Sequence, residues 1–82
     1  MDIFYNLKDV NINGYYRMYL KDENDKEQTI NVLIKYVDGF FYDGSTSEKW
    51  SFEEIQNIKL NMHLYNDNYP NSCYVKLIKN IE

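Results

Sequence analysis

Residues 10–21, VNINGYYRMYLK, decide the fold of this chain. Hydrophobic side chains recur there at every second position, which is the period of a β-strand with one buried face. The run therefore predicts one long strand from Val10 to Lys21, with Gly14 marking a bulge or kink in it. The row expected to face inward is Val10, Ile12, Gly14, Tyr16, Met18 and Leu20, and the outward row is Asn11, Asn13, Tyr15, Arg17, Tyr19 and Lys21.

A second alternating run occupies residues 27–37, beyond a polar turn at 22–26. A loop of this length pairs Lys21 with Glu27 and brings the inward rows of the two runs together, so we expect an antiparallel hairpin. The inner pairs expected from this register are Met18 with Ile30, Tyr16 with Val32 and Gly14 with Ile34. The outer pairs expected are Tyr19 with Thr29, Arg17 with Asn31 and Tyr15 with Leu33.

The dipeptide Asp38-Gly39 predicts a two-residue type I′ turn, because both central positions of that turn require positive φ. The hairpin that it closes is expected to pair Val37 with Phe40, Tyr36 with Phe41 and Lys35 with Tyr42. Shorter alternating segments predict further strands near residues 3–7, 58–64 and 73–79. In the last of these, the residues expected on one face are Cys73, Val75 and Leu77.

Residues 49–58, KWSFEEIQNI, carry the clearest helix start in the chain. Ser51 can cap a helix while Glu54 reaches back to the Ser51 amide, which is a capping box. Trp50 and Ile55 are placed for a hydrophobic staple across the same cap. We expect one or two helical turns here, between two β regions. The side chains expected to plug the surrounding sheet are Trp50, Phe52 and Ile55.

These patterns predict a single, mainly β domain over residues 1–82, with five or six antiparallel strands in a meander and one short helix near 51–57. Strands at such spacings curl into a small barrel or sheet. The order of three strands, a short helical turn and a further strand resembles that of SH3-like and Sm-like barrels. The alternative is an α+β sheet on which residues 47–57 form a longer helix packed across one face.

Aromatic residues are expected to supply the core of this short chain. Its 82 residues include nine Tyr, four Phe and one Trp, and no alanine. Each buried ring removes roughly 150–250 Å² from water, so few rings are needed. The absence of the best helix former favours strands.

The chain carries 13 acidic and 9 basic residues, for a formal net charge of −4. Nucleic-acid binding depends on phosphate neutralisation by Lys and Arg, so this balance disfavours direct contact with DNA or RNA. We expect neither a signal peptide nor a membrane span, and therefore a cytoplasmic protein.

No constellation of residues predicts catalysis. Cys73 is the single cysteine, so it makes no intramolecular disulfide, and its alternation places it in the core. The single histidine, His63, falls on the outward row of its segment. The three glycines are scattered and form no phosphate-binding loop. We expect a protein without enzymatic activity, cofactor or metal.

Two surfaces are candidates for binding. The first is the outer face of the first three strands, which is too aromatic for an ordinary solvated face. Its residues are Tyr15, Arg17, Tyr19, Leu33, Val37, Phe40 and Tyr42. Three possibilities remain for what packs over this face: the chain's own helix or terminal strands, a second copy in a homodimer, and a foreign partner. The second surface is an acidic hairpin tip suited to a basic partner, made by Asp22, Glu23, Asp25 and Glu27.

These features predict a small acidic interaction protein that binds and inhibits a host nucleic-acid-handling protein with a basic groove. Asn, Lys, Ile and Tyr, which have AT-rich codons, dominate the chain and favour a phage or mobile-element origin. In size and charge the chain is similar to small phage-encoded inhibitors such as anti-CRISPR proteins and uracil-DNA glycosylase inhibitors. Two alternatives stay open. One is a host-encoded small barrel that serves as an accessory or dimerisation domain, and the other is a barrel that stacks single-stranded nucleic acid on its aromatic residues.

Overall fold

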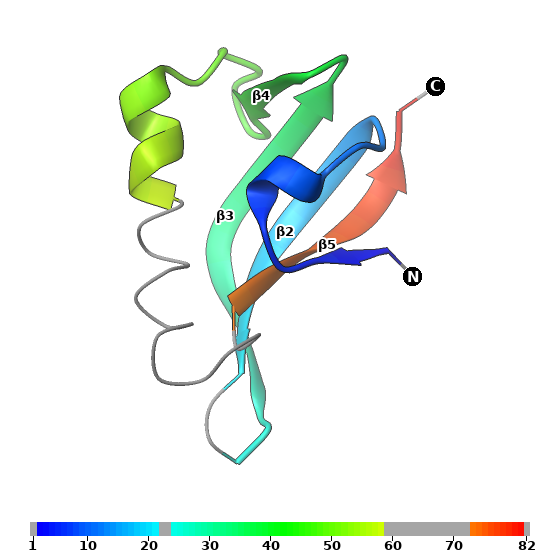
Figure 1. The fold of residues 1–82 in the computed structure, drawn as a ribbon, viewed down its shortest axis with the longest axis vertical. Coiled ribbons are helices and arrows are strands. Elements are labelled where there is room, and N and C mark those ends of the chain that lie inside the picture. Colours follow the sequence, from blue (N-terminus) through cyan, green and yellow to red (C-terminus); the bar gives the residue numbers. More distant parts are fainter. Residues whose placement is uncertain (1, 22–23, 59–72, 82) are drawn as a thin grey trace.

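The computed structural model describes residues 2–21, 24–58 and 73–81. The described chain forms one antiparallel sheet, and residues 52–58 are helical (Figure 1). The other elements, in chain order, are β1 (Ile3–Phe4), the 3-10 helix η1 (Leu7–Asp9), β2 (Gly14–Lys21), β3 (Glu27–Val37), β4 (Phe40–Asp43) and β5 (Cys73–Asn80). The predicted mainly β class with one short helix is confirmed.

The strands lie in the order β1-β5-β2-β3-β4. β2, β3 and β4 follow one another as a meander, while β5 returns from the far end of the sequence to pair with the free side of β2. Figure 1 shows β5 and β2 side by side. This placement puts residues from the end of the chain on the same two faces as those of β2.

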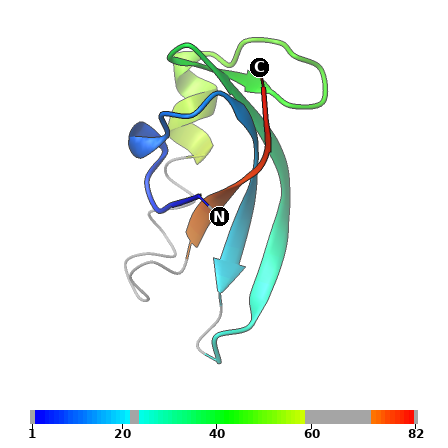
Figure 2. The same ribbon diagram turned by 90° about the vertical axis from the view of Figure 1, so that its right-hand side faces the viewer.

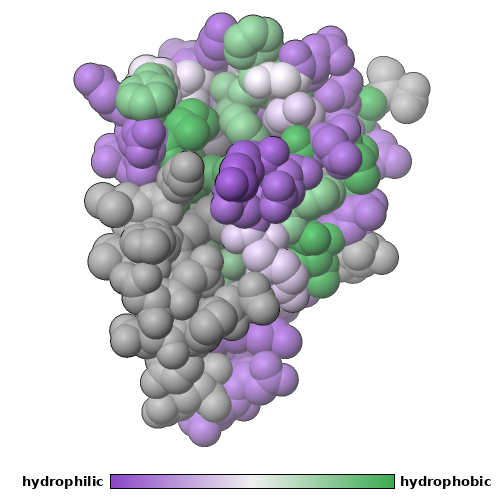
Figure 3. Space-filling model, in the orientation of Figure 1, coloured by the Kyte–Doolittle hydropathy of each residue, from purple (hydrophilic) through white to green (hydrophobic). Residues whose placement is uncertain are grey.

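One face of the sheet holds the core. Figure 2 shows η1 and the helix on the same side of the curved sheet, and no helix on the other side. Trp50 and Ile58 pack against a buried cluster on the covered side. That cluster consists of Leu7, Val10, Tyr16, Met18, Ile34, Cys73 and Val75. On the outside of this covered side, hydrophilic residues interrupt the hydrophobic ones, so no single continuous hydrophobic patch is visible (Figure 3).

The hairpin at Asp38-Gly39 forms as predicted. φ is 48° at Asp38 and 94° at Gly39, as a type I′ turn requires. The expected pairs are all present, namely Val37 with Phe40, Tyr36 with Phe41 and Lys35 with Tyr42.

The hairpin of β2 and β3 keeps the predicted register only near its tip, from Lys21–Glu27 to Met18–Ile30. A bulge next to Met18 then moves the partner of Tyr16 from Val32 to Ile34, a shift of two residues. The predicted pairs Tyr16–Val32, Gly14–Ile34, Tyr15–Leu33 and Arg17–Asn31 are therefore wrong. The pairs formed are Tyr16–Ile34, Gly14–Tyr36, Tyr15–Lys35 and Arg17–Leu33. Because a shift of two residues leaves every side chain on its original face, the inner and outer rows are as predicted.

Strand β2 begins at Gly14 rather than at Val10, because the preceding residues leave the sheet. Val10 packs in the core beside η1, and the Tyr16 hydroxyl donates to the Ile12 carbonyl at 2.5 Å, which holds the connection over the inner face. A β-carbon at position 14 would lie 2.5 Å from the Lys79 carbonyl oxygen. Strand β5 can therefore approach this closely only where the residue is glycine. The irregularity in the ladder between β2 and β5 falls just beyond this contact.

The predicted capping box is present at the helix start. The Glu54 amide donates to Ser51 Oγ at 3.2 Å, and the Ser51 amide donates to Glu54 Oε1 at 3.5 Å. The predicted plug is wrong for Phe52, which is 75% exposed. Trp50, whose amide donates to a β4 carbonyl at 3.1 Å, occupies the place beside the core at this end of the helix.

The helix also replaces the start of a predicted strand. Ile58 is helical and packs on the core, so the alternating pattern that begins there does not begin a strand. The rest of the predicted strand, including His63, lies outside the described residues.

Candidate functional site

The side of the sheet away from η1 and the helix (Figure 2) is here called the outer face, and the strand ladders place the predicted aromatic residues on it. Directly paired residues of neighbouring antiparallel strands project to the same side, so the ladders assign each side chain to a face. The outer face consists of Ile3, Tyr5, Tyr15, Arg17, Tyr19, Lys21, Glu27, Thr29, Leu33, Lys35, Val37, Phe40, Tyr42, Lys49, Tyr74, Lys76 and Lys79. All seven residues predicted for the aromatic sheet surface belong to it.

Sequence reasoning missed the residues that other segments add to this face. Tyr74, Lys76 and Lys79 join it because β5 pairs with β2, and Lys49 joins it through an isolated bridge to Tyr42. The alternation of Tyr74 and Lys76 with the core row was visible in the sequence. The alternation does not show which strand pairs with β5 in the sheet.

At one end of the outer face, ammonium groups lie over aromatic rings. Lys35 Nζ is 5.8 Å from the ring centroid of Tyr15 and 6.0 Å from that of Tyr42. Lys49 Nζ is 3.9 Å from the ring centroid of Phe40, which is 50% exposed. These five residues, named here the Lys35 cluster, present flat apolar surface and positive charge together.

Toward the hairpin tip lies a second group, named here the Lys76 cluster, built on the buried ring of Tyr74. Tyr19 stacks on this ring with centroids 5.9 Å apart, and Tyr5 meets it edge-on at 5.6 Å. Lys76 Nζ is 4.7 Å from the Tyr19 centroid and 2.7 Å from Glu27 Oε2. The Tyr74 hydroxyl donates to the same carboxylate oxygen. A single lysine thus joins a stacked pair of rings to the one carboxylate of the cluster.

These contacts shift the pKa values of two groups in opposite directions. Bonds from Lys76 and then from Tyr74 hold the pKa of the Glu27 carboxyl below its ordinary value. Burial, followed by the bond to Glu27, raises the pKa of the Tyr74 hydroxyl. At neutral pH the carboxylate is therefore ionised and the phenol protonated, which is the combination that their hydrogen bond requires.

Arg17 lies between the two clusters. It is directly opposite Lys76 on one neighbouring strand and Leu33 on the other. Like charges directly opposite each other in a sheet are destabilising, and no ion pair to Arg17 is present within the described residues. This pair of cations would be stabilised by an anion placed between them.

The outer face concentrates positive charge in an acidic protein. Six of the 9 basic residues of the chain lie on it, and Glu27 is the one acidic residue that the described ladders place there. The six are Arg17, Lys21, Lys35, Lys49, Lys76 and Lys79. The remainder of the chain thus holds three of the 9 basic residues and twelve of the 13 acidic ones. The outer face is therefore basic although the chain as a whole has a net charge of −4.

The predicted acidic tip is described only in part, since Asp22 and Glu23 lie outside the described residues. Asp25 pairs with Lys21 at 3.3 Å, and Glu27 pairs with Lys76 at 2.7 Å. Both described acids of the tip thus engage lysines of this chain.

The chain's own helix, one of the covers considered for the outer face, lies on the opposite side of the sheet (Figure 2). Strands β1 and β5 are members of the sheet and do not lie over it. The rings at the margins are open to solvent, with Tyr5 45% and Phe40 50% exposed. Within the described ranges the outer face is therefore available for a partner.

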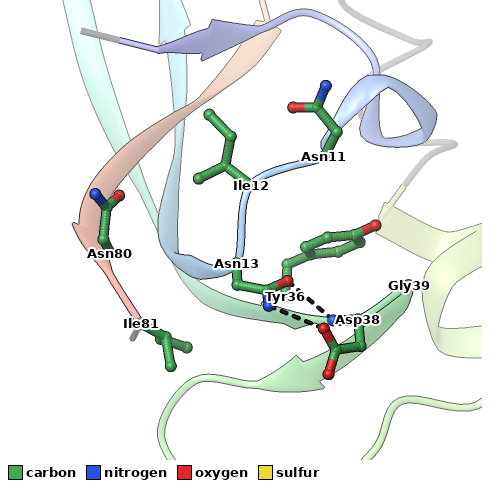
Figure 4. Close-up of a pocket in the computed structure, with 8 residues that line it drawn as sticks. All are labelled: Asn11, Ile12, Asn13, Tyr36, Asp38, Gly39, Asn80 and Ile81. Atoms are coloured by element: carbon green, nitrogen blue, oxygen red, sulfur yellow. Dashed lines mark hydrogen bonds between the residues drawn. The ribbon is translucent and has the colours of Figure 1, made fainter.

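An open hollow of about 580 Å³ lies where β2 begins, and two of its lining residues, Asn13 and Asp38, are hydrogen-bonded to each other (Figure 4). Asn13 Nδ2 donates to Asp38 Oδ1 at 3.0 Å, and the Asp38 amide donates to Asn13 Oδ1 at 2.9 Å. These bonds tie the β3–β4 turn to the start of β2, which is a structural role. The lining residues are Asn11, Ile12, Asn13, Tyr36, Asp38, Gly39, Asn80 and Ile81.

Cys73 is fully buried, as predicted, and burial raises the pKa of its thiol to about 11. A thiol that stays protonated is a poor nucleophile and metal ligand. In the part of the chain that the structure describes, no three His, Cys, Asp or Glu side chains are grouped as a metal site.

No helix in the described ranges combines the length and the apolar character needed to cross a bilayer. The chain matches no protein-family model, no curated protein and no solved structure.

Proposed function

We propose that this protein is a non-enzymatic binding module that holds single-stranded nucleic acid on the outer face of its sheet. The observation that carries the proposal is the interleaving of six basic side chains with aromatic rings on a face that no described helix covers. Unpaired bases stack on aromatic rings with roughly 1–3 kcal/mol per base. Lys and Arg neutralise the phosphates, and both kinds of group share this one surface.

Each of the two clusters is proposed to bind a different base of the ligand. Tyr15 and Tyr19 stand four residues apart on β2, which is roughly 13 Å along a strand, so separate bases can occupy the two ends of the face. Arg17, between them, and the neighbouring Lys76 are placed for the connecting phosphates. An extended ligand strand running along β2, from Tyr15 past Arg17 to Tyr19, would meet rings and cations in turn.

The net charge of −4 disfavours this function only if the charge is spread evenly over the surface. Binding responds to the local potential, and clefts or faces of one sign attract counter-ions even when the whole molecule has the other sign. Among the described acids, Asp9 lies on η1 and Glu53 on the helix, both on the opposite side of the sheet, so they oppose approach from that side more than approach to the outer face.

The test is binding of a fluorescently labelled oligothymidylate, followed by anisotropy from low to high salt. Wild-type protein is expected to bind, with affinity that falls as salt rises. Tyr15→Ala is expected to weaken binding by roughly five- to a hundredfold through lost stacking. Arg17→Ala is expected to weaken binding and to reduce the salt slope by about 0.7, the value of one phosphate contact on a single strand.

Lys8→Ala is the matched control for Arg17→Ala, since Lys8 is an exposed cation of η1 on the opposite side of the sheet. It is expected to change neither affinity nor slope. Absence of binding at low salt, or an equal loss in Lys8→Ala and Arg17→Ala, would overturn the proposal. Equal affinity for a duplex of the same length would contradict the part of the proposal in which unpaired bases stack on the rings.

We propose as a second candidate the phage or mobile-element inhibitor that binds a basic groove of a host nucleic-acid-handling protein. The observation that favours it is the acidity of the remaining surface, where Asp9, Glu48 and Glu53 are among the exposed residues. Its test is retention of one such host protein from nuclease-treated lysate. The double change Glu48→Gln/Glu53→Gln is expected to abolish this retention, whereas Tyr15→Ala leaves it intact. The opposite pattern would exclude this candidate.

A homodimer formed through the outer faces is opposed by charge. A two-fold contact would bring two sets of six cations together, and like charges across an interface are repulsive. Sedimentation is expected to show a monomer at moderate salt, and a stable dimer disrupted by Phe40→Ala would favour the dimerisation alternative.

A further inference from the structure

Glu27 is the one acidic side chain that the described ladders place on the outer face. It stands at the start of β3, and its Oε2 lies 2.7 Å from Lys76 Nζ. The buried hydroxyl of Tyr74 donates to the same oxygen and fixes the carboxylate in place. A carboxylate is thus held at the cation that adjoins the stacked rings.

Lys76 is the cation on which the proposed site depends most at this end. Its Nζ lies 4.7 Å from the Tyr19 centroid, and its strand position is directly opposite Arg17. Carboxylate and phosphate oxygens are both anionic acceptors for an ammonium group. In the free protein the carboxylate therefore occupies the position that a phosphate of the ligand would need.

A phosphate that takes the place of the carboxylate at Lys76 breaks one ion pair, and the hydrogen bond from Tyr74 opposes the departure of Glu27. The ion pair is partly exposed, with the side chains of Lys76 and Glu27 22% and 34% accessible. Partly exposed ion pairs add little to stability, so a phosphate with several charged oxygens can compete with the carboxylate for Lys76. Lys21 is the direct cross-strand partner of Glu27 and offers the released carboxylate a second cation.

We propose that Glu27 is an internal competitor for the ligand phosphate, which it excludes from Lys76 until nucleic acid displaces it. This inference rests on the proposed function and adds to it a regulator of the same site. Glu27 lowers affinity for any anion and so favours ligands that also supply bases to stack on the rings.

The test is the isosteric change Glu27→Gln, measured with the same labelled oligothymidylate. Its amide oxygen can still accept from Tyr74, so the fold is expected to be retained, which an unfolding curve checks. Affinity is expected to rise roughly two- to fivefold as the competing ion pair is removed. The salt slope is expected to steepen slightly, because the displaced Glu27 carboxylate of the wild-type protein takes up cations that the ligand releases.

Asp9→Asn is the matched control, because Asp9 is an exposed acid of η1 on the opposite side of the sheet and loses the same single charge. It is expected to leave the slope unchanged. In the double variant Glu27→Gln/Lys76→Gln the gain in affinity is expected to disappear, because the cation that Glu27→Gln frees is no longer present.

An equal gain in affinity in Asp9→Asn, or no gain in Glu27→Gln while wild-type protein binds, would overturn this inference and leave the proposed function standing. Failure of both proteins to bind would overturn the two together.

Discussion

Alternate residues of β2 serve two faces that differ in nearly every property. On the inner face, Tyr16 and Met18 are 1% and 2% exposed and pack with aliphatic neighbours. On the outer face, Tyr15 and Arg17 are half-buried and lie among cations. Even the tyrosines differ, since the Tyr16 hydroxyl donates to a carbonyl of its own chain while the Tyr15 ring lies near the Lys35 ammonium.

The comparison indicates that the inner row of this strand stabilises the fold, while the outer row carries the side chains of the proposed binding site. The inner row is apolar because its side chains leave water on folding, whereas the outer row keeps charges beside rings at a surface that the described helices do not cover. Substitutions of adjacent residues should therefore have different consequences, and the following four experiments probe that difference from the largest effect to the smallest.

The sharpest contrast is between the neighbours Ile34 and Leu33. Ile34 is 0% exposed, so Ile34→Ala is expected to lower the free energy of unfolding by about 2–5 kcal/mol. Leu33 is half-buried on the outer face, so Leu33→Ala is expected to lower the free energy of unfolding by clearly less than Ile34→Ala does. Urea unfolding followed by Trp50 fluorescence measures both, and equal losses would contradict the division into two faces.

Gly14→Ala should also damage the inner face. The new β-carbon would lie 2.5 Å from the Lys79 carbonyl and 2.6 Å from Leu77 Cδ1, so β5 must move away. We expect a loss of about 1–3 kcal/mol, typical of overpacking. Gly39→Asn is the control, since nothing lies within 4 Å of that position and Asn tolerates its positive φ. A smaller loss at position 14 than at 39 would contradict the close approach of β5.

Ser51→Ala removes the helix cap and should loosen only the covered side. The loss is expected to be about 1 kcal/mol, because the Glu54 amide loses its acceptor. Unfolding curves of Ser51→Ala and of the exposed helix control Gln56→Ala provide the measurement. If Ser51→Ala abolished nucleic-acid binding at full folded population, the separation of the two faces would be lost.

The smallest effect concerns the acid dependence of Glu27. Its pKa is lowered by Lys76 and then by Tyr74, from an ordinary value of 4.5, so the ionised form stabilises the fold. This contribution is complete above pH 4.5 and is lost as the pH falls through the depressed folded pKa. Because the pair is partly exposed, the contribution is expected to be under about 1 kcal/mol. The stability difference between wild-type protein and Glu27→Gln should shrink on acidification, and a difference that grows would reverse the sign.

Local chemistry made several features predictable. The turn at Asp38-Gly39 follows from residues that accept positive φ, and the cap from Ser51 and Glu54 three positions apart. The two rows of β2 and β3 follow from the alternation of side chains along a strand, so the aromatic residues of the outer face were assembled correctly even though the register of the hairpin was not.

The bulge beside Met18, the exposure of Phe52 and the position of β5 were decided by tertiary structure. Each depends on which distant segment occupies a given place, and alternation alone is the same for every register shifted by two residues. The charge of the outer face belongs to this second group. Lys76 and Arg17 are far apart in the sequence and become neighbours only because β5 closes onto β2, since packing of the whole sheet selects strand neighbours and local sequence does not.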